Sequence, residues 1–275
     1  MPVSRGKCPN SLRRALVFVL SVVLVFSSCA LVKRLLEYRT AAREYAAYAS
    51  MMNEPMPSDT PAPAWETPAA EDPALSASHT PIPKMTAIPY YSDEILRLKS
   101  QNSDTVGYLQ IEGTAIQYPV VKGKDNEYYA THTFAKKRNA SGSIYMDCKN
   151  SADLSDFNTV LYGHNMKDGS MFHDLLQYRK TSFLQEHRKI VLTGLFEKKT
   201  YYVFSVYIAD QDTDVRGFGK LSAYERQEFL KALLARSGIS AGAATPTVDD
   251  EYITLVTCRE NSDGDYFVVH GILVE

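Results

Sequence analysis

Residues 252–258 read YITLVTC and residues 266–274 read YFVVHGILV, with a short polar segment between them. β-Branched and aromatic side chains dominate both runs, which favours the extended conformation of a β-strand. Turn residues such as Asp263-Gly264 separate these and several earlier runs. Eight short strands with few helices predict a mainly β domain, built as a closed barrel or a sandwich. The six earlier runs lie at residues 107–111, 116–121, 142–147, 159–163, 189–194 and 200–209.

Helical patterns interrupt the strands at three places. Residues 93–101 read DEILRLKSQ and space their apolar side chains as a short amphipathic helix does. Ser222 and Glu225 form an S-x-x-E capping box, and leucine and aromatic residues recur at helical spacing after it. This stripe predicts a packing surface, and Gly238 would end the helix. A shorter helix is expected at residues 170–178.

An uncharged, mostly apolar run occupies residues 15–32. As a helix it would span ~27 Å at about 1.5 Å per residue, close to the hydrocarbon thickness of a bilayer. Basic residues before the run favour a cytoplasmic N-terminus, although Lys33 and Arg34 follow it directly. A cleaved signal peptide, or a lipoprotein signal ending at Cys29, is the alternative. The length of the run and the poor fit of Phe26 to a lipobox favour an uncleaved transmembrane anchor.

The composition divides the chain into five parts. We expect residues 1–14 to be cytoplasmic, residues 15–32 to cross the membrane, and residues 33–52 to continue the helix beside it. Residues 53–89 hold nine of the thirteen prolines and few large aliphatic side chains, so they cannot bury enough apolar surface to fold. This Pro/Ala-rich linker predicts an extended spacer that holds a domain away from the membrane. The folded domain would occupy residues 90–275, outside the cell.

The bulk properties exclude several functions. The net charge of -2 lacks the strong basic excess of a nucleic-acid-binding surface, so no nucleic-acid partner is expected. The chain contains no GxSxG elbow, P-loop, HExxH motif or dinucleotide fingerprint, and we expect neither a cofactor nor a metal. Cys8 and Cys29 lie in or before the apolar run, which leaves Cys148 and Cys258 in the domain. Their spacing gives no argument for a disulfide framework or a zinc site.

Two reactive side chains stand at the ends of predicted strands. His164 follows the apolar run at residues 159–163, which would place an imidazole at the rim of the sheet. Cys258 ends the run YITLVTC, and a thiol followed by a polar hairpin is exposed enough to react. A neighbouring imidazolium would favour the thiolate, which is the nucleophilic form. The other histidines, such as His79 in the linker and His270 within the last strand, are better explained by solvation or packing.

Both strand ends belong to longer motifs. Thr254-Leu255-Val256-Thr257-Cys258 resembles the TLxTC signature of the sortase family, and LYGHNMKDGSMF at residues 161–172 resembles the histidine segment of its class B branch. Residues 107–121 are similar to the opening strands of that family, and DNEYY at residues 125–129 follows as expected. The resemblance runs in order from about residue 93 to residue 275, without large gaps.

The resemblance implies an eight-stranded β-barrel with an N-terminal helix and a helix, matching residues 222–236, in the loop before the cysteine strand. It implies a transpeptidase in which the Cys258 thiolate attacks a threonyl carbonyl of a sorting-signal peptide and forms a thioester. His164 would protonate the leaving amine and later act as the base. An amine from a cell-wall precursor or a pilin lysine would resolve the thioester. The protein would be anchored in the cell membrane by a single span, with its catalytic domain extracellular.

One position departs from the family pattern. Class B sortases often read RFVV on the strand after the cysteine, whereas this chain reads YFVV, with Tyr266 in the place of the arginine. The resemblance implies that the arginine holds the substrate backbone and stabilises the oxyanion, and losing one such donor typically costs about 10²–10³-fold in rate. The Tyr266 hydroxyl could donate one hydrogen bond but brings no charge. Arg259 would point to the opposite face by strand alternation, and Arg216 lies in the loop before the capped helix.

Two other functions stay open at this point. A catalytically impaired sortase fold could bind sorting-signal peptides or assist another sortase. The presence of both Cys258 and His164 within full motifs favours the enzyme over this alternative. A cysteine hydrolase such as a cell-wall peptidase is a poorer match, because those enzymes usually place the cysteine before the histidine.

Overall fold

The computed structural model describes residues 10–53, 92–210, 221–237, 246–258 and 264–275. For residues 10–13 and for Cys258 only the main chain is described. Several predictions fall outside these ranges: the cytoplasmic N-terminus up to residue 9, the linker from residue 54 on, Gly238, Arg216 and Arg259.

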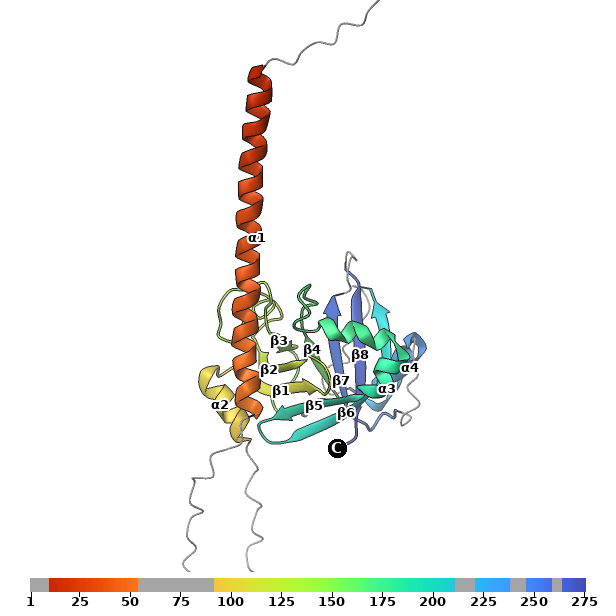
Figure 1. Cartoon of the computed structure of the whole chain (residues 1–275). Helices are drawn as coiled ribbons and strands as arrows, with labels where there is room; N and C mark the ends of the chain where they lie inside the picture. Colours follow the sequence, from red (N-terminus) through yellow and green to blue (C-terminus); the bar gives the residue numbers. More distant parts are fainter. Residues whose placement is uncertain (1–9, 54–91, 211–220, 238–245, 259–263) are drawn as a thin grey trace, which may run out of the picture.

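Eight strands close into a barrel, in the order β1-β2-β3-β4-β7-β8-β6-β5 (Figure 1). Every strand predicted from the sequence is present, and each end lies within two residues of the prediction. The mainly β class is therefore confirmed, as a barrel and not a sandwich. The strands are β1 (Thr105–Ile111), β2 (Gln117–Lys122), β3 (Ile144–Met146), β4 (Asn158–Tyr162), β5 (Lys189–Gly194), β6 (Lys198–Ala209), β7 (Tyr252–Cys258) and β8 (Tyr266–Leu273).

The last strands are apolar along most of their length because both of their faces are buried. In β7, Leu255 belongs to the core inside the barrel, whereas its neighbour Val256 belongs to a second cluster on the outside. This alternation follows from the pleat, which points successive side chains to opposite faces. Helix α4 (Ala223–Arg236) covers the outer cluster with Leu230 and Leu233. The predicted packing surface is present at Leu230 and Leu233, whereas Tyr224 and Leu234 of the same stripe are exposed.

Two helices, α2 and α4, start where the sequence predicts, and a serine caps the N-terminus of each. Helix α2 occupies Asp93–Gln101, the predicted range, and the Ser92 hydroxyl accepts a hydrogen bond from Ile95 N at 3.3 Å. At the start of α4, Ser222 and Glu225 form both hydrogen bonds of the predicted capping box.

The prediction of a helix at residues 170–178 was wrong in the type of helix and in its position. A 3₁₀ helix, η1 (His173–Arg179), takes its place, and a short helix α3 (Thr181–Glu186) that the sequence did not indicate follows it. Met171 has a φ of 58°, in the left-handed region. A residue in this region cannot continue a right-handed helix, so helical structure starts only after it.

His270 is fully buried on the outer face of β8, beneath α4. Its Nδ1 lies 2.9 Å from the Thr254 hydroxyl and its Nε2 lies 3.0 Å from the Tyr207 hydroxyl. Thr254 already donates its proton to Asn158, so a neutral ring with its hydrogen on Nδ1 satisfies the network. Burial, together with the nearby charge of Arg236, lowers the pKa of His270 to about 3. The predicted packing role of His270 is consistent with this environment.

We expect the buried His270 to make the fold sensitive to mild acid. In the unfolded chain a histidine binds a proton below a pKa of about 6.5, whereas folded His270 stays neutral down to about pH 3. The free energy of unfolding therefore keeps its full value above the pKa of the unfolded histidine and falls as the pH drops through that pKa. The loss should be about 2 kcal/mol between pH 7 and pH 5, and His270→Gln should flatten this slope.

The free energy of unfolding, measured by denaturant titration at several pH values, checks this expectation. His132→Gln is the control, because the His132 ring lies on the loop after β2, is only half-buried, and should leave the slope unchanged. An equal slope in wild type and His270→Gln would contradict the assignment.

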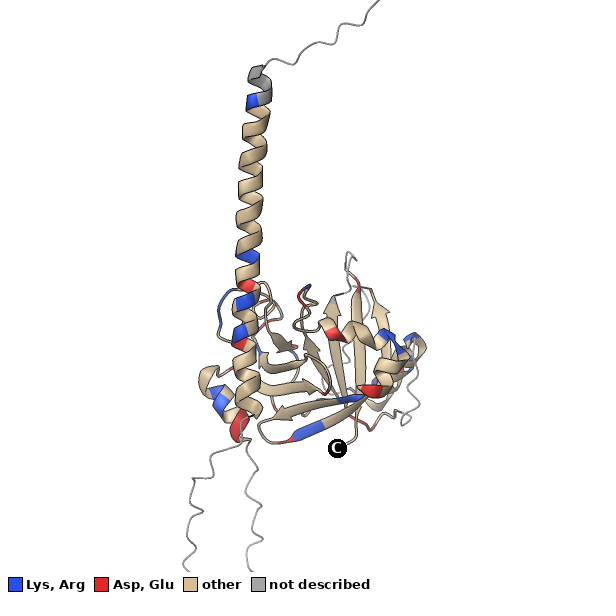
Figure 2. Ribbon diagram, viewed as in Figure 1, with Lys and Arg blue, Asp and Glu red and all other residues tan. Residues whose placement is uncertain are grey.

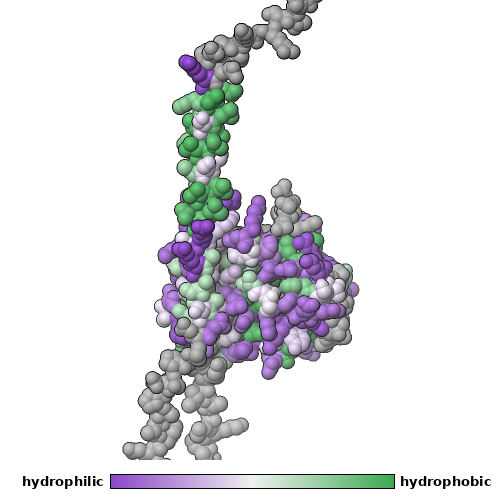
Figure 3. All heavy atoms as spheres, viewed as in Figure 1, coloured by the Kyte–Doolittle hydropathy of each residue, from purple (hydrophilic) through white to green (hydrophobic). Residues whose placement is uncertain are grey.

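Helix α1 (Asn10–Asn53) is continuous over 44 residues but has two surroundings (Figure 1). Its first part projects from the domain as an exposed apolar column, and no charge interrupts it between two basic bands (Figures 2 and 3). With a mean hydropathy of 2.8 it is long and apolar enough for a membrane anchor or a signal sequence. Its last part packs on the barrel through the buried side chains of Ala41, Tyr45 and Tyr48.

The segments that flank the predicted linker, the end of α1 and helix α2, lie beside each other. Arg97 of α2 donates a hydrogen bond from Nη2 to the main-chain oxygen of Met51 at 3.4 Å, and Gln101 Nε2 lies 3.7 Å from the Met51 sulfur. The chain thus enters and leaves residues 54–91 at one place on the domain. The distance from the apolar part of α1 to the barrel is therefore fixed by the docked helix and not by the length of the linker.

Tyr45 is the main polar contact between α1 and the barrel. Burial raises the pKa of its hydroxyl, which donates to Gly142 O at 2.6 Å and accepts from Phe134 N at 3.3 Å. Tyr45→Phe would leave both main-chain groups without this partner, and we expect it to lower the free energy of unfolding by about 2 kcal/mol. Thermal unfolding of the full chain in detergent measures the loss. Tyr224→Phe, at a ring that is 71% exposed on α4, should change nothing, and equal melting of both variants would contradict the role of Tyr45.

Candidate active site

The topology of the barrel brings the ends of two distant strands together. Strands β4 and β7 pair in parallel, with Tyr162 opposite Val256. The next main-chain hydrogen bond runs from Gly163 N to Val256 O at 3.2 Å. Parallel strands end at the same edge, and the register places the main chains of His164 and Cys258, two residues further on, side by side there. The sequence indicated each strand end, but not that the two strands are neighbours.

Gly163 lets the side chains of Ile144 and Phe172 pack against the main chain between β4 and His164. A Cβ atom at this position would lie 2.4 Å from Ile144 Cδ1 and 2.8 Å from Phe172 Cδ2, so only hydrogen fits. Beyond it the chain folds back, and Phe172 N donates to the main-chain oxygen of His164 at 2.9 Å. The backbone that carries the imidazole is therefore fixed from both sides.

The orientation of the His164 ring defines its tautomer. Nε2 lies 2.6 Å from the main-chain oxygen of Ala130, on the loop after β2. A carbonyl oxygen can only accept, so Nε2 carries a hydrogen and donates it. Nδ1 has no partner among the described residues and is the position open to exchange a proton with a ligand. The neighbouring His173 differs, because its Nδ1 is held by Asn165 Oδ1 at 2.8 Å.

A cavity with a volume of ≈ 320 Å³ opens beside His164. Its walls come from the loop after β2 and from β3, β4, β7 and β8. Tyr145 and Tyr162 stack in its wall, with ring centroids 5.3 Å apart. The Thr257 hydroxyl is buried in this wall and has no hydrogen-bond partner among the described residues. The lining residues are Asn126, Tyr145, Tyr162, Gly163, His164, Val256, Thr257 and Tyr266.

Two lining side chains that the sequence analysis did not assign are held by one buried carboxylate. Asp147 Oδ2 accepts from Asn126 Nδ2 and from the Tyr162 hydroxyl, both at 2.9 Å. Asn126 Oδ1 in turn accepts from Cys148 N at 2.8 Å. Asp147 thus positions two polar side chains that line the cavity. The sequence shows a carboxylate at the end of the predicted strand 142–147, but nothing in it indicates these contacts.

Tyr266, the candidate oxyanion residue, lies directly across the hairpin from Cys258 in the register of β7 and β8. It also borders the cavity with His164. The main chains of Tyr266 and Cys258 therefore lie side by side, as the hairpin in the sequence predicts. Cys148, the other cysteine of the domain, is free. Within the described ranges, no three His, Cys, Asp or Glu side chains are grouped to hold a metal ion.

Comparisons with known proteins agree with this geometry. The sequence model of the sortase domain matches residues 109–274. Sortase B of Listeria monocytogenes is 33% identical over 184 residues, which cover 66% of this chain and 74% of that protein. Sortase B of Staphylococcus aureus is 35% identical over 165 residues, covering 59% and 66%.

Solved structures give the same result. The crystal structure of sortase B from B. anthracis in complex with AAEK1 has a TM-score of 0.69 at 28% identity and covers 88% of this chain and 99% of that one. The Staphylococcus aureus sortase B-substrate complex has a TM-score of 0.63 at 30% identity, covering 68% and 87%. Both support the barrel with an N-terminal helix.

The chain belongs to the sortase family, since the family match spans more than half of it. Within that family it is a class B sortase, as its relatives are. It is accordingly a cysteine transpeptidase that anchors proteins and binds sorting-signal peptides. The resemblance noted in the sequence is confirmed, and the alternative of an impaired binding protein is not favoured.

Proposed function

We propose that this sortase cleaves a C-terminal sorting signal after threonine through a thioester on Cys258, with His164 as the acid and base. The observation that supports the proposal most is the shared edge of β4 and β7, where the main chains of His164 and Cys258 lie side by side and where His164 and Thr257 line one cavity. A nucleophile and a base on adjacent strands need no large movement to reach the same substrate bond.

The proposed reaction has two halves. The Cys258 thiolate attacks the threonyl carbonyl carbon, a C–S bond forms, and the carbonyl oxygen becomes an oxyanion. When this intermediate collapses, the peptide C–N bond breaks and His164 gives a proton to the leaving amine. An acceptor amine, from a cell-wall precursor or a pilin lysine, then attacks the thioester. His164 takes the proton of that amine, and Cys258 leaves as the thiolate.

Tyr266 is the proposed donor to the oxyanion. Its ring borders the cavity and its main chain lies opposite Cys258. Tyr266→Phe should lower kcat/KM for peptide cleavage about tenfold or more, because a donor aimed at developing charge acts mainly in the transition state. Tyr266→Arg, which adds the charge that the family uses, should raise it.

Steady-state cleavage assays measure both variants of Tyr266. Tyr224→Phe, at an exposed ring on α4 away from the cavity, is the matched control and should keep the wild-type rate. If Tyr266→Phe also keeps that rate, the oxyanion donor is another group and the assignment of Tyr266 is wrong.

The placement in the cell is part of the proposal. Residues 15–32 cross the membrane once, residues 1–14 stay in the cytoplasm, and residues 33–52 continue the helix onto the domain outside. Residues 53–89 form a linker, and residues 90–275 form the catalytic domain. The exposed apolar column of α1 supports this topology, because such a surface is unfavourable in water.

Mass spectrometry tests the proposed function directly. The full chain in detergent is incubated with a panel of sorting-signal peptides, with a glycine-based amine or a lysine peptide as the acceptor. The full chain is needed because α1 packs on the barrel through Tyr45 and Tyr48. We expect cleavage after threonine, an adduct on Cys258, and a product joined to one of the amines. Peptide binding without adduct or product would contradict the proposal.

A further inference from the structure

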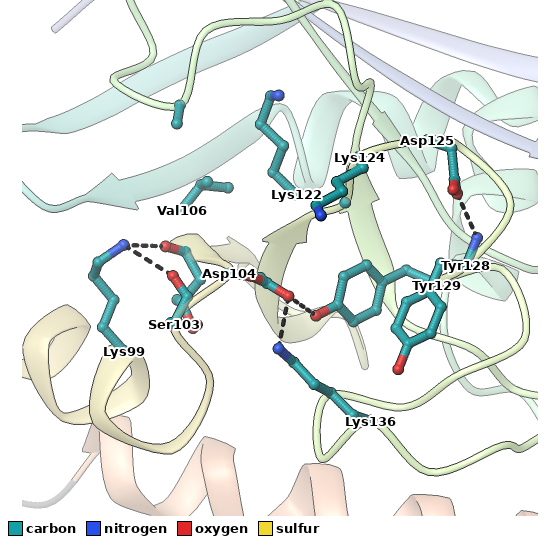
Figure 4. Close-up of a pocket in the computed structure, with 13 residues that line it drawn as sticks. Lys99, Ser103, Asp104, Val106, Lys122, Lys124, Asp125, Tyr128, Tyr129 and Lys136 are labelled. Carbon is teal, nitrogen blue, oxygen red and sulfur yellow. Dashed lines mark hydrogen bonds and ion pairs between the residues drawn. The ribbon is translucent and has the colours of Figure 1, made fainter.

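A second cavity lies beside α2 and is lined by other residues than the candidate active site (Figure 4). Its volume is ≈ 450 Å³, and it is bordered by the end of α2, the start of β1, the end of β2 and the loop that follows. We call it the lysine cavity. Four positive and two negative side chains line it, which leaves an excess of positive charge: Lys99, Lys122, Lys124, Lys136, Asp104 and Asp125.

Two of its lysines form no ion pair with a carboxylate in the part of the chain that the structure describes. Lys99 Nζ donates to the main-chain oxygen of Thr105 at 2.8 Å, and Lys122 Nζ donates to that of Cys148 at 3.0 Å. Both side chains are half-buried. Among the described residues no carboxylate oxygen lies within 4.0 Å of either ammonium group. A half-buried charge without a counter-ion is costly, and an anionic ligand would relieve that cost.

The two aspartates of the cavity are already engaged. Asp104 accepts from Lys136 Nζ at 2.8 Å and from the Tyr129 hydroxyl at 2.7 Å. Asp125 Oδ1 accepts from two main-chain N–H groups of its own loop, at 2.9 and 2.8 Å. Neither aspartate forms an ion pair with Lys99 or Lys122 in the described part of the chain, although Lys99 lies near enough to Asp104 to interact with its charge, and Lys124 is exposed at the rim. Figure 4 shows the lysines approaching the cavity from different sides.

We propose that the lysine cavity binds a phosphate group carried by a water-soluble molecule. Several ammonium groups around one space match a doubly charged anion with several acceptor oxygens better than a single carboxylate. The cavity is also larger than one phosphate ion, so it has room for part of the molecule that carries the group.

The position of the cavity favours a soluble source over a lipid headgroup, a step that rests on the proposed anchor. Ala135, next to Lys136, donates from its N–H to Glu44 Oε1 at 3.0 Å. Glu44 lies twelve residues beyond Val32, the end of the apolar run, which is ~18 Å along the helix at about 1.5 Å per residue. The headgroup layer adds only ~5–8 Å to each side of the hydrocarbon core, so it would not reach the cavity.

Calorimetric titration of the full chain in uncharged lipid nanodiscs, with inorganic pyrophosphate and with glycerol 3-phosphate, tests the proposal. We expect saturable binding that weakens with added salt. Lys122→Met should weaken it about tenfold or more, because one charge-assisted hydrogen bond is lost. Lys124→Met should also weaken it, and this exposed side chain can be changed without disturbing the fold. Lys137→Met is the control, since Lys137 is exposed nearby but does not line the cavity.

Two results would overturn the inference. The first is no binding of either probe, or equal weakening by Lys124→Met and Lys137→Met. The second is loss of pyrophosphate binding when the nanodiscs contain anionic lipid, which would make a headgroup the occupant and the soluble source wrong. Neither result depends on peptide cleavage, so a failure here is distinguishable from a failure of the proposed function.

Discussion

A Cys258→Ala chain is expected to form no thioester adduct with a sorting-signal peptide and to lose cleavage activity by about 10⁴-fold or more. Covalent catalysis splits a difficult acyl transfer into two easier steps, and removal of the nucleophile closes that route completely. Alanine keeps the main chain of residue 258, which pairs with Tyr266 across the hairpin. Peptide binding, measured by calorimetry, should therefore remain close to that of the wild type.

Cys148→Ala is the matched control for the nucleophile. Cys148 is free and half-buried, and its hydrogen bonds to the described residues use the main chain alone: its N–H donates to Asn126 and its carbonyl accepts from Lys122. Alanine keeps both groups, so adduct formation and turnover should survive. An adduct on the Cys258→Ala chain, or loss of turnover in Cys148→Ala, would show that the wrong cysteine has been assigned.

The strands and capped helices could be predicted because their signals are local. The run YITLVTC is apolar on both faces, and the pairing of Ser222 with Glu225 needs only three residues of separation. The prediction of a helix at residues 170–178 was wrong because Met171 adopts a left-handed conformation, which is set by the fold around it. Pairing β4 with β7 in parallel joins segments about ninety residues apart, and no local pattern encodes such a contact.

The residues of the candidate site also divide into those that the sequence indicates and those that it does not. His164 and Cys258 could be singled out because each ends an apolar strand and stands in a recognisable motif. Asp147 and Asn126 could not, because their roles lie in contacts with each other and with Tyr162. The docking of α1 was also missed: an alanine-rich helix predicts a continuing helix, but the partner of Tyr45 is Gly142, 97 residues away.

His164→Gln is expected to lower turnover by about 10³-fold, within the range that general acid–base catalysis contributes, and to leave peptide binding nearly intact. The glutamine amide can still donate to Ala130 O, the bond that Nε2 makes at 2.6 Å, but it cannot give a proton to the leaving amine or take one. The variant therefore separates the proton transfer from the hydrogen bond that holds the ring. His173→Gln is the matched control, because the Nδ1 atom of His173 is already bound to Asn165.

Single-turnover mass spectrometry divides this loss between the two halves of the reaction. A group that protonates the leaving amine and later deprotonates the acceptor must slow both the formation of the thioester and its resolution. If His164→Gln slowed resolution alone, another group would have to protonate the leaving amine. If His164→Gln slowed neither half of the reaction, the open Nδ1 atom beside the cavity would have no role in proton transfer. A loss in both halves, absent from His173→Gln, is the result that only a proton-transferring His164 explains.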